Sequence, residues 1–531
     1  MVASFSTPHI EYGQLSPVLI LLGVAVVGVL VEASVPRARR YAVQAVLAVA
    51  GTVAALVAAV LVFVELHPGS AHPGLGKIVA EGAFALDGPT LVCWVLVLVL
   101  TLLSVLLFAE RRLESGVTAF AGQAAALPGT EAEREASTKG LEHTEVFPLL
   151  LFSASGMLMF PAANDLLTMF VGLEVLSLPL YLLCGLARRR RLLSQEAALK
   201  YFMLGAFSSG FFVYGIALVY GYAGSMHLSG IAQAVSGRSG AHALLLGGLG
   251  LMAVGLLFKV AAVPFHAWTP DVYQGAPTAV TGFMAVATKV AAFGALLRLF
   301  YVAFGGARWD WTPMMWVIAI LTMVIGSVLA LSQTDIKRLL AYSSIAHAGF
   351  VLVGFLGARS LGDLQPGQIA PVQAVLFYLT TYGLMTIAAF ALVTVVRDGS
   401  GEATALSRWT GLGKESPLVA GLMAFLLLAM AGIPLTSGFT GKWAVFSSAM
   451  SAGAWPLVII AVFASAIALA FYIKVIVLMF FVDPVGEAPS VAVPSALTSL
   501  VVSVGVAGTL VLGIVPGPLL DLLGRVGVFI R

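Results

Sequence analysis

Charge is scarce in this sequence of 531 residues: Asp, Glu, Lys and Arg together make up 10% of it, whereas hydrophobic residues make up 60%. The mean hydropathy is +1.02. A soluble domain carries roughly 25% charged residues, and a disordered segment is more polar still, so both classes are excluded. A polytopic membrane protein remains. Because a spanning helix needs roughly 20 mostly apolar residues, the chain has room for about fourteen spans.

Cysteine is also scarce, since only Cys93 and Cys184 are present and both lie in apolar runs. Two isolated thiols exclude a cysteine-ligated iron–sulfur cluster, a structural zinc site and a disulfide scaffold. The sequence shows no cluster of metal ligands and no G-x-x-x-x-G-K-[ST] phosphate loop, so it predicts neither a metal centre nor ATP hydrolysis. The net charge of +3 is too small to indicate a nucleic-acid partner.

Long apolar runs, in contrast, are abundant. They are continuous and show no alternation of period two, which favours an all-α polytopic protein over a β-barrel. The first run is expected to be a permanent span and not a signal peptide, because no small-residue cleavage site with a basic start precedes it. The fourteen predicted spans are 17–35, 42–65, 88–109, 146–163, 165–186, 195–223, 243–270, 277–303, 312–332, 336–357, 369–396, 417–450, 454–482 and 493–523.

Basic residues are distributed unevenly between the loops. One set of alternate loops holds sixteen of them, and the other set, which includes both termini, holds six. Cytoplasmic loops of membrane proteins carry the excess of Lys and Arg, so both termini are expected outside. The rich set is Arg37, Arg39, Arg40, Arg111, Arg112, Arg134, Lys139, Arg188, Arg189, Arg190, Arg191, Lys337, Arg338, Arg397, Arg408 and Lys414; the poor set is Lys77, Arg238, Arg308, Arg359, Arg525 and Arg531.

The sequence contains an internal repeat, in which spans four to eight recur as spans nine to thirteen. The fifth span opens with residues 164–167 (NDLL) and the tenth with residues 334–337 (TDIK). Five spans per copy is an odd number, so the second copy must be inverted, and inverted repeats with broken helices are typical of transporters. The predicted units are 1–144 (three spans and a polar loop), 145–303 (first repeat, broken helix 243–270), 304–482 (inverted repeat, broken helix 417–450) and 483–531 (last span).

Lysine is concentrated inside the spans. Of only nine lysines in the chain, five lie well inside predicted spans, and Lys337, at the start of the span 336–357, is counted with the loops. A charge at the bilayer centre costs about 2.5–3.5 kcal/mol on insertion scales, so this placement indicates a function. Burial also disfavours the charged form of an amine, so a buried lysine is suited to proton exchange near neutral pH. The five are Lys200, Lys259, Lys289, Lys442 and Lys474.

A carboxylate and a proline accompany the first of the deeply placed lysines. Glu174 lies in the middle of span five, where it is either a static salt-bridge partner or the acidic partner of a switchable Lys259. Five residues after Lys259, Pro264 breaks the helix and frees carbonyls that can hold water. His266 lies in this break and either relays protons or satisfies the freed backbone groups.

Three further candidates lie in later spans. Lys289 has no acidic residue within one helical turn, so it is predicted to share a proton with its neighbours through water. Lys442 follows the break in span twelve and is the counterpart of Lys259 in the repeat. His347 in span ten is a relay candidate, with a structural role as the alternative.

Three basic residues lie nearer to span ends. For Lys200 a relay role and snorkelling to the interface are both open, whereas Lys474 and Arg298 are expected to snorkel.

Several of these stretches carry a family resemblance: Glu174–Leu180 (EVLSLPL), Ala197–Gly215, and Pro264–Thr278 (PFHAWTPDVYQGAPT) between Lys259 and Lys289. Through them the chain resembles the antiporter-like membrane subunits of bacterial NADH–quinone oxidoreductase, respiratory complex I. Among these it is similar to the subunit N family. M-type chains usually carry a glutamate where Lys442 stands, and L-type chains continue with a long lateral helix after the last span.

The resemblance implies a role for each matching residue. Glu174 and Lys259 would form the ion pair of the proton-input side. Lys289 would be the central relay and Lys442 the output residue. Lys200 and His266 match further polar positions of the same axis. With His347, the predicted relay comprises Glu174, Lys200, Lys259, His266, Lys289, His347 and Lys442.

The resemblance also implies a setting. The chain would be a multi-pass subunit of the bacterial inner membrane that moves protons outward, with the other membrane subunits of complex I as partners. NADH, FMN, iron–sulfur clusters and quinone would be handled by partner subunits, and this chain would hold no cofactor. Two alternatives stay open: a subunit of an Mrp-type sodium/proton antiporter, and a structural membrane subunit whose buried charges are static.

Overall fold

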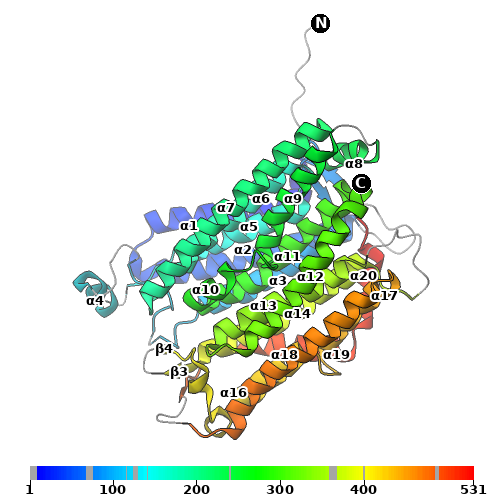
Figure 1. Cartoon of the computed structure of the whole chain (residues 1–531). Helices are drawn as coiled ribbons and strands as arrows, with labels where there is room; N and C mark the ends of the chain where they lie inside the picture. The colour runs from blue at the N-terminus through cyan, green and yellow to red at the C-terminus, as the bar shows by residue number, and fades with distance from the viewer. Residues whose placement is uncertain are drawn as a thin grey trace.

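The computed structural model describes residues 9–66, 76–114, 116–123, 130–139, 141–237, 241–357, 367–398, 401–484 and 490–530. Within them the chain is mostly helical, and twelve helices are long and apolar enough to cross a membrane. Most of these helices run side by side along one direction (Figure 1). The predicted helical membrane fold is therefore confirmed. The total of fourteen spans stays a prediction, because the other two expected spans correspond to shorter helical pieces.

The helices before residue 308 supply seven of the twelve long apolar helices. Here the remaining expected span corresponds to the 17-residue helix α5. The elements are α1 (Tyr12–Ser34), α2 (Arg37–Leu66), α3 (Gly88–Phe108), α4 (Glu131–Thr138), α5 (Val146–Ala162), α6 (Leu166–Cys184), α7 (Arg191–Ala223), α8 (Leu228–Gly237), α9 (His242–Lys259), α10 (Trp268–Gly275) and α11 (Thr278–Arg298), followed by the short helices η1 (Leu299–Ala303) and η2 (Gly305–Ala307).

The second half contains the other five long helices. Its elements are α12 (Arg308–Leu331), α13 (Ile336–Phe355), α14 (Pro371–Val395), η4 (Leu406–Trp409), α15 (Leu412–Glu415), α16 (Pro417–Ala431), α17 (Ser437–Ser451), α18 (Trp455–Phe481), α19 (Ala496–Ile514) and α20 (Gly517–Val526). Short antiparallel strands join the loops: β1 (Lys77–Val79) pairs with β2 (Phe84–Leu86), and β3 (Val396–Asp398) lies between β4 (Gly401–Glu402) and β5 (Ser490–Val491).

Three helices form the centre of the bundle. Every residue of α11 is buried, and α13 and α14 are almost as enclosed, whereas α1, α2 and α19 expose most of their apolar surface. Apolar outer faces are expected of helices that contact lipid or other membrane proteins. Both cysteines, Cys93 and Cys184, are also buried. The central helices carry Lys289 and His347, so these polar groups lie far from the bundle surface.

Both predicted broken helices are interrupted. Helix α9 ends at Lys259 and α10 begins at Trp268, while α16 ends at Ala431 and α17 begins at Ser437. A non-glycine residue with positive φ lies in each break, Ala261 at 61° and Leu435 at 70°. Such conformations cannot continue a right-handed helix.

The two halves share local features at corresponding places. Asp165 caps α6 by accepting from the Thr168 amide at 2.8 Å, and Asp335 caps α13 by accepting from the Lys337 amide at 2.9 Å. Each helix start then pairs with a later loop, through Leu166 N to Met226 O at 3.0 Å and Ile336 N to Thr404 O at 2.7 Å. Two inverted copies would produce this match, although the repeat and the unit boundaries stay predictions.

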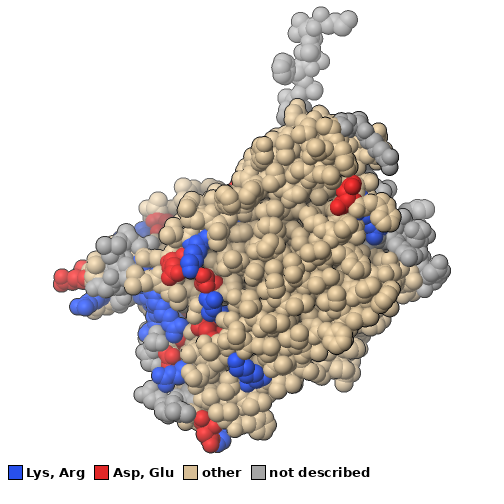
Figure 2. All heavy atoms as spheres, in the orientation of Figure 1, with Lys and Arg blue, Asp and Glu red and all other residues tan. Residues whose placement is uncertain are grey.

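The ends of the described chain lie at one end of the bundle. The His9 amide donates to Glu81 at 2.7 Å and the Ile530 amide donates to Asp87 at 3.1 Å, both beside the β1–β2 hairpin. Most Lys and Arg on the visible face gather at the opposite end, near β3 and β4 (Figures 1 and 2). We call this the basic end. The membrane side that it faces stays a prediction, and Arg238, Arg359 and Arg531 lie outside the described residues.

Arg298 was expected to snorkel to the interface, but it does not. Its side chain is fully buried, with Nη2 at 2.6 Å from Asp87 Oδ1 and Nε donating to the Pro161 carbonyl at 2.7 Å. The Phe529 ring covers the guanidinium at 4.9 Å. Asp87, the N-cap of α3, supplies the counter-charge inside the bundle, so the arginine need not reach the interface. Lys474 is more accessible and donates to Leu331 O at the end of α12 at 3.0 Å.

Removal of the buried counter-charge should destabilise the fold. Breaking a buried ion pair from one side typically costs about 3–5 kcal/mol, so Asp87→Ala should lower the thermal unfolding temperature of the detergent-solubilised protein by several degrees. Asp483→Ala, which breaks the exposed pair with Lys414 (2.5 Å), is the control and should have no measurable effect. Equal unfolding temperatures for the two variants would contradict a stabilising role for Asp87.

Candidate functional site

Lys259 is the last residue of α9 and is only 3% exposed. Its Nζ donates to Ser177 Oγ at 2.8 Å and to the Tyr181 hydroxyl at 3.4 Å. Both partners belong to α6, three and seven residues after Glu174, so the three side chains follow one face of that helix. The buried ammonium therefore faces a polar stripe that has a carboxylate at one end.

The expected ion pair between Glu174 and Lys259 is not a direct contact in this structure. The carboxylate attracts the ammonium electrostatically, but the hydrogen bonds of Lys259 are to hydroxyls one and two turns further along α6. Glu174 Oε1 has no hydrogen-bond partner among the described residues. Sequence spacing placed both charges in the membrane, but it could not fix their relative height.

The break after Lys259 is partly filled by aromatic groups. Trp268 Nε1 donates to the Phe258 carbonyl at 3.1 Å, which satisfies a carbonyl that the helix end leaves free. The Trp268 ring stacks on Tyr201 with a centroid distance of 4.6 Å, and Lys259 Nζ lies 5.6 Å from the Tyr201 ring. His266 is half-buried in the break, and its Nδ1 has no hydrogen-bond partner among the described residues.

Lys289 lies in the middle of α11 and is 2% exposed. Its Nζ donates to the Ser344 carbonyl of α13 and lies 5.4 Å from the Tyr382 ring centroid. The Tyr382 hydroxyl in turn donates to Ser344 Oγ at 2.7 Å. Among the described residues no carboxylate forms an ion pair with Lys289. Ser344 is thus the point at which α11, α13 and α14 exchange polar contacts.

His347 lies one turn after Ser344 on α13 and is 2% exposed. Its Nδ1 is 2.7 Å from the Tyr378 hydroxyl and its Nε2 is 3.2 Å from the Tyr472 hydroxyl. Both Lys289 and Lys442 act on it electrostatically. Each ring nitrogen of an imidazole can give or take a proton, so both nitrogens of His347 face hydroxyls with which they could exchange one.

Lys442 lies in α17 but reaches back across the break. Its Nζ donates to the Met430 and Ala431 carbonyls at 3.1 and 2.7 Å and to Ser465 Oγ at 2.8 Å. These carbonyls end α16, where no helical amide follows to satisfy them and the helix dipole is negative. Gly432 adopts φ +93°, and a Cβ there would lie 3.1 Å from Lys442 Cδ. The break between α16 and α17 therefore forms the binding site of the Lys442 ammonium.

A cavity of about 530 Å³ opens beside Lys442. Its wall includes Ser465 and Ser447 together with the aromatic side chains of Trp443 and Phe446. Lys442 is itself 6% exposed, so the ammonium lies at the inner end of a path to the surface of α17 and α18.

Lys200 does not belong to the buried row. Its side chain is 42% exposed and pairs with Asp271 and Glu196, each at 2.7 Å. Asp271 also binds Arg338 at 2.6 Å. The cluster borders a cavity of about 160 Å³ at the basic end. The position of Lys200 agrees with the interfacial alternative for this residue, although its long side chain is held by ion pairs and is not free.

Some residues of the site were not identified from the sequence. Tyr378, Tyr472 and Ser344 connect the charged groups, but no spacing rule indicates which hydroxyl faces them. Lys337 was counted among the loop cations, yet it is 2% exposed in the first turn of α13. The sequence did indicate this position, because Asp335 is a strong N-cap residue and so places Lys337 inside the helix.

Comparison with known proteins identifies the family. The family model described as NADH:quinone oxidoreductase/Mrp antiporter, TM, matches residues 163–468. The chain is 64% identical over 531 residues to NADH-quinone oxidoreductase subunit N of Nocardioides sp., covering 99% of this chain and 100% of the relative. The chain belongs to the NADH-quinone oxidoreductase subunit N family. Subunit N of Mycobacterium bovis is 51% identical and covers 99% of both chains.

Solved structures agree with a membrane subunit of complex I. A chain of respiratory complex I from Thermus thermophilus superposes with a TM-score of 0.74 at 34% identity, covering 96% of this chain and 99% of that one. A chain of the Mrp complex from Dietzia sp. has a TM-score of 0.76 at 21% identity over 98% of this chain and 97% of its own, which shows a shared fold alone. As a subunit N family member, the chain is a subunit of a redox enzyme complex.

The contact between the helix break and the Lys442 side chain can be tested at Gly432. An L-residue at φ +93° costs about 1–2 kcal/mol, and its Cβ would press on the lysine side chain. Gly432→Ala should therefore speed hydrogen–deuterium exchange in the peptide spanning residues 428–445. Gly421→Ala in α16, where a Cβ meets nothing within 4 Å, is the matched control and should leave this exchange unchanged. Unchanged exchange in both variants would contradict the proposed strain.

Proposed function

We infer that this chain moves protons outward across the bacterial inner membrane, driven by quinone reduction elsewhere in the complex. The relay consists of Glu174, Lys259, Lys289, His347 and Lys442. The observation that carries the proposal is the chemistry around the three lysines: each is at most 6% exposed, and among the described residues each donates only to neutral oxygens. A permanently charged, uncompensated ammonium is costly in a membrane, whereas an amine that alternates between charged and neutral forms suits proton transfer.

The Glu174–Lys259 pair is the proposed switch. A carboxylate that approaches an ammonium stabilises the charged form, and its withdrawal favours release of the proton. The present separation, with Ser177 hydrogen-bonded to Lys259, corresponds to the withdrawn arrangement. Moving one charge through 100 mV requires about 2.3 kcal/mol, whereas each unit of change in proton affinity supplies about 1.4 kcal/mol. A modest movement of one side chain is therefore sufficient.

From Lys259 the proton would pass along hydroxyls and water. The Tyr201 ring lies 5.6 Å from Lys259 Nζ and stacks on Trp268, whose ring meets that of Tyr273 edge-on. From Lys289 the next carrier is His347, whose tyrosine contacts lead toward Lys442. The cavity beside Lys442 would then release the proton. Lys200 and His266 lie outside the buried row, and we assign them to proton exchange at its uptake end.

The proposal assigns cofactors and orientation as follows. NADH, FMN, iron–sulfur clusters and quinone belong to partner subunits; within the described residues no group of three or more His, Cys, Asp or Glu could hold a metal ion. The other membrane subunits, including the other antiporter-like chains, are the partners. The basic end faces the cytoplasm, and both termini face outside. Units 145–303 and 304–482 each provide one broken helix.

Loss of a relay lysine should abolish pumping. Lys259→Ala and Lys442→Ala should reduce NADH-driven acidification of inverted membrane vesicles to roughly a tenth or less, and Lys259→Arg should fail as well because a guanidinium does not release its proton. Lys474→Ala is the control, since Lys474 only caps the end of α12. Acidification at the wild-type rate in Lys259→Ala vesicles would contradict the proposed relay.

The contacts of His347 generate a second prediction. The double substitution Tyr378→Phe with Tyr472→Phe removes both hydroxyls that bind the imidazole, so acidification should slow several-fold while the rings still fill the core. Tyr301→Phe is the matched control: it removes the buried hydroxyl that donates to Phe355 O at 2.5 Å, outside the relay. A similar loss of acidification in both would mean that core disturbance, and not the His347 contacts, limits pumping.

The shared family model leaves an Mrp-type exchanger as the alternative. Such a subunit would use the same row but exchange sodium for protons without redox drive. Vesicles that contain the complex, placed in a sodium gradient without NADH, distinguish the two functions. Redox-driven pumping predicts no pH change under that gradient. A sodium-dependent pH change that Lys259→Ala abolishes would favour the exchanger.

A further inference from the structure

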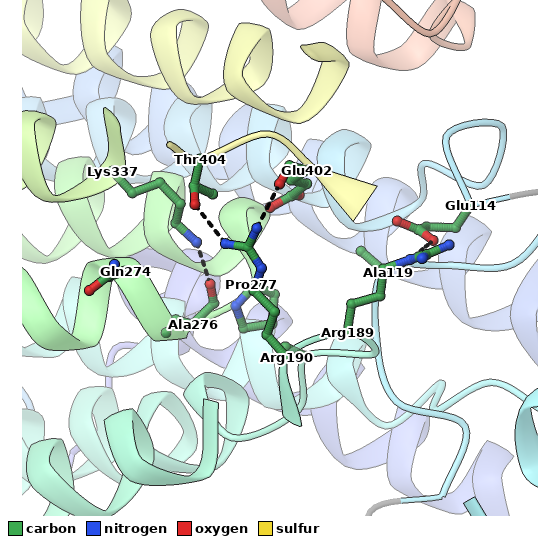
Figure 3. Close-up of a pocket in the computed structure, with 12 residues that line it drawn as sticks. Glu114, Ala119, Arg189, Arg190, Gln274, Ala276, Pro277, Lys337, Glu402 and Thr404 are labelled. Carbon is green, nitrogen blue, oxygen red and sulfur yellow. Dashed lines mark hydrogen bonds and ion pairs between the residues drawn. The ribbon is translucent and has the colours of Figure 1, made fainter. Parts of the chain in front are cut away.

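A small, partly open pocket lies at the basic end, where both halves of the chain meet (Figure 3). It is formed by the start of α7, the α10–α11 junction, the first turn of α13 and the β4 region. Its volume is about 50 Å³, which is sufficient for water. Arg190 crosses the pocket and donates to Thr404 Oγ1 at 2.6 Å and to the Glu402 carbonyl at 3.2 Å. The pocket is therefore polar and close to the surface.

Lys337 is the one deeply buried amine in this wall. It is 2% exposed, and its Nζ donates to the Ala276 carbonyl at 2.6 Å (Figure 3). An ammonium has three donors, so the protons that Ala276 does not accept are available to water in the pocket. Glu402, Asp335 and Arg190 act on it electrostatically, but among the described residues none forms an ion pair with it. Lys337 thus resembles the relay lysines in having a neutral oxygen partner.

The geometry of α13 connects this amine to the relay. Lys337 and Ser344 are seven residues apart, so they lie on the same face of the helix at a separation of about 10 Å along its axis. Ser344 is the residue whose carbonyl accepts from Lys289. Lys337 and Ser344 therefore place the pocket at the basic end and the contact of Lys289 on one face of α13.

We propose that Lys337 is a proton-uptake residue that loads Lys289 from water at the basic end. The neutral Lys337 amine takes a proton from a hydronium ion in the pocket, so that an N–H bond forms and an O–H bond breaks. The ammonium then returns one proton to a water molecule on the α13 side, and that water protonates the neutral Lys289 amine. Water is the only co-reactant, and charge is conserved at each transfer. The inference rests on the proposed function, and it gives the middle of the relay its own supply.

A purely structural role makes a different prediction. The first turn of α13 also holds α10 through Gln274 to Asp335 at 3.2 Å and through Asp271 to Arg338 at 2.6 Å. In a purely structural role, the hydrogen bond from Lys337 to the Ala276 carbonyl would add to these contacts between α10 and α13. Arginine separates the two roles, because it keeps a permanent positive charge and hydrogen-bond donors but does not release a proton.

The test uses the complete complex in inverted membrane vesicles, with Lys337→Arg and Lys337→Met compared with wild type. Both variants should assemble, and both should lower NADH-driven acidification at least about threefold, as loss of a proton-transfer group does. The slower uptake should also increase the ratio of pumping rates in water and deuterium oxide. Lys414→Arg, in the exposed pair with Asp483 at the same end, is the matched control and should change neither quantity.

Two results would overturn the inference. Wild-type acidification and an unchanged isotope ratio in Lys337→Arg would show that a fixed positive charge is enough, so that the role of Lys337 is purely structural. Wild-type acidification in Lys337→Met would show that no charge is needed. If the methionine variant does not assemble, the arginine variant still decides between the roles. Failure of the relay itself would appear separately, as undiminished pumping in Lys259→Ala.

Discussion

The structure depends on how an amine is accommodated inside an apolar bundle. A carboxylate beside each lysine would stabilise it, but would also hold its proton. The chain instead supplies neutral oxygens. Lys442 takes the last carbonyls of α16, Lys289 takes a carbonyl of α13, and Lys259 takes hydroxyls of α6. The break between α16 and α17 is needed for the contacts of Lys442, because a continuous helix consumes most of its own carbonyls.

The bundle also contains a buried positive charge that, unlike the lysines, is fully paired with a carboxylate. Arg298 and Asp87 are both fully buried and paired at 2.6 Å, and the arginine is further bound to Pro161 and covered by Phe529. Arginine stays charged under all ordinary conditions, so a full counter-charge suits it. The contrast separates two uses of burial in one chain. Paired charges fix the packing of α3 against α11, whereas weakly compensated amines remain able to change protonation state.

Much of this arrangement could be predicted from the sequence. Apolar runs located the helices, Pro264 and the 433–438 stretch (IPLTSG) located the breaks, and lysines within apolar runs identified the candidate groups. Such patterns specify depth along a helix and leave its rotation toward a neighbour undetermined. The partner of Arg298 is distant in the chain, and the hydroxyls around His347 come from two other helices, so these contacts required coordinates. Lys337 was misjudged because a position just after a loop was taken as exposed, although an N-cap precedes it.

The burial of both cysteines has a practical consequence. Cys93 and Cys184 lie inside the bundle, so the native chain offers no thiol on its described surface to a water-borne maleimide. A cysteine introduced at Ser447 or Ser465, in the wall of the cavity beside Lys442, would therefore be labelled against a silent background. The membrane face from which a charged reagent reaches it would reveal the side on which that cavity is wetted. The molecule is in this sense already prepared for mapping its aqueous routes position by position.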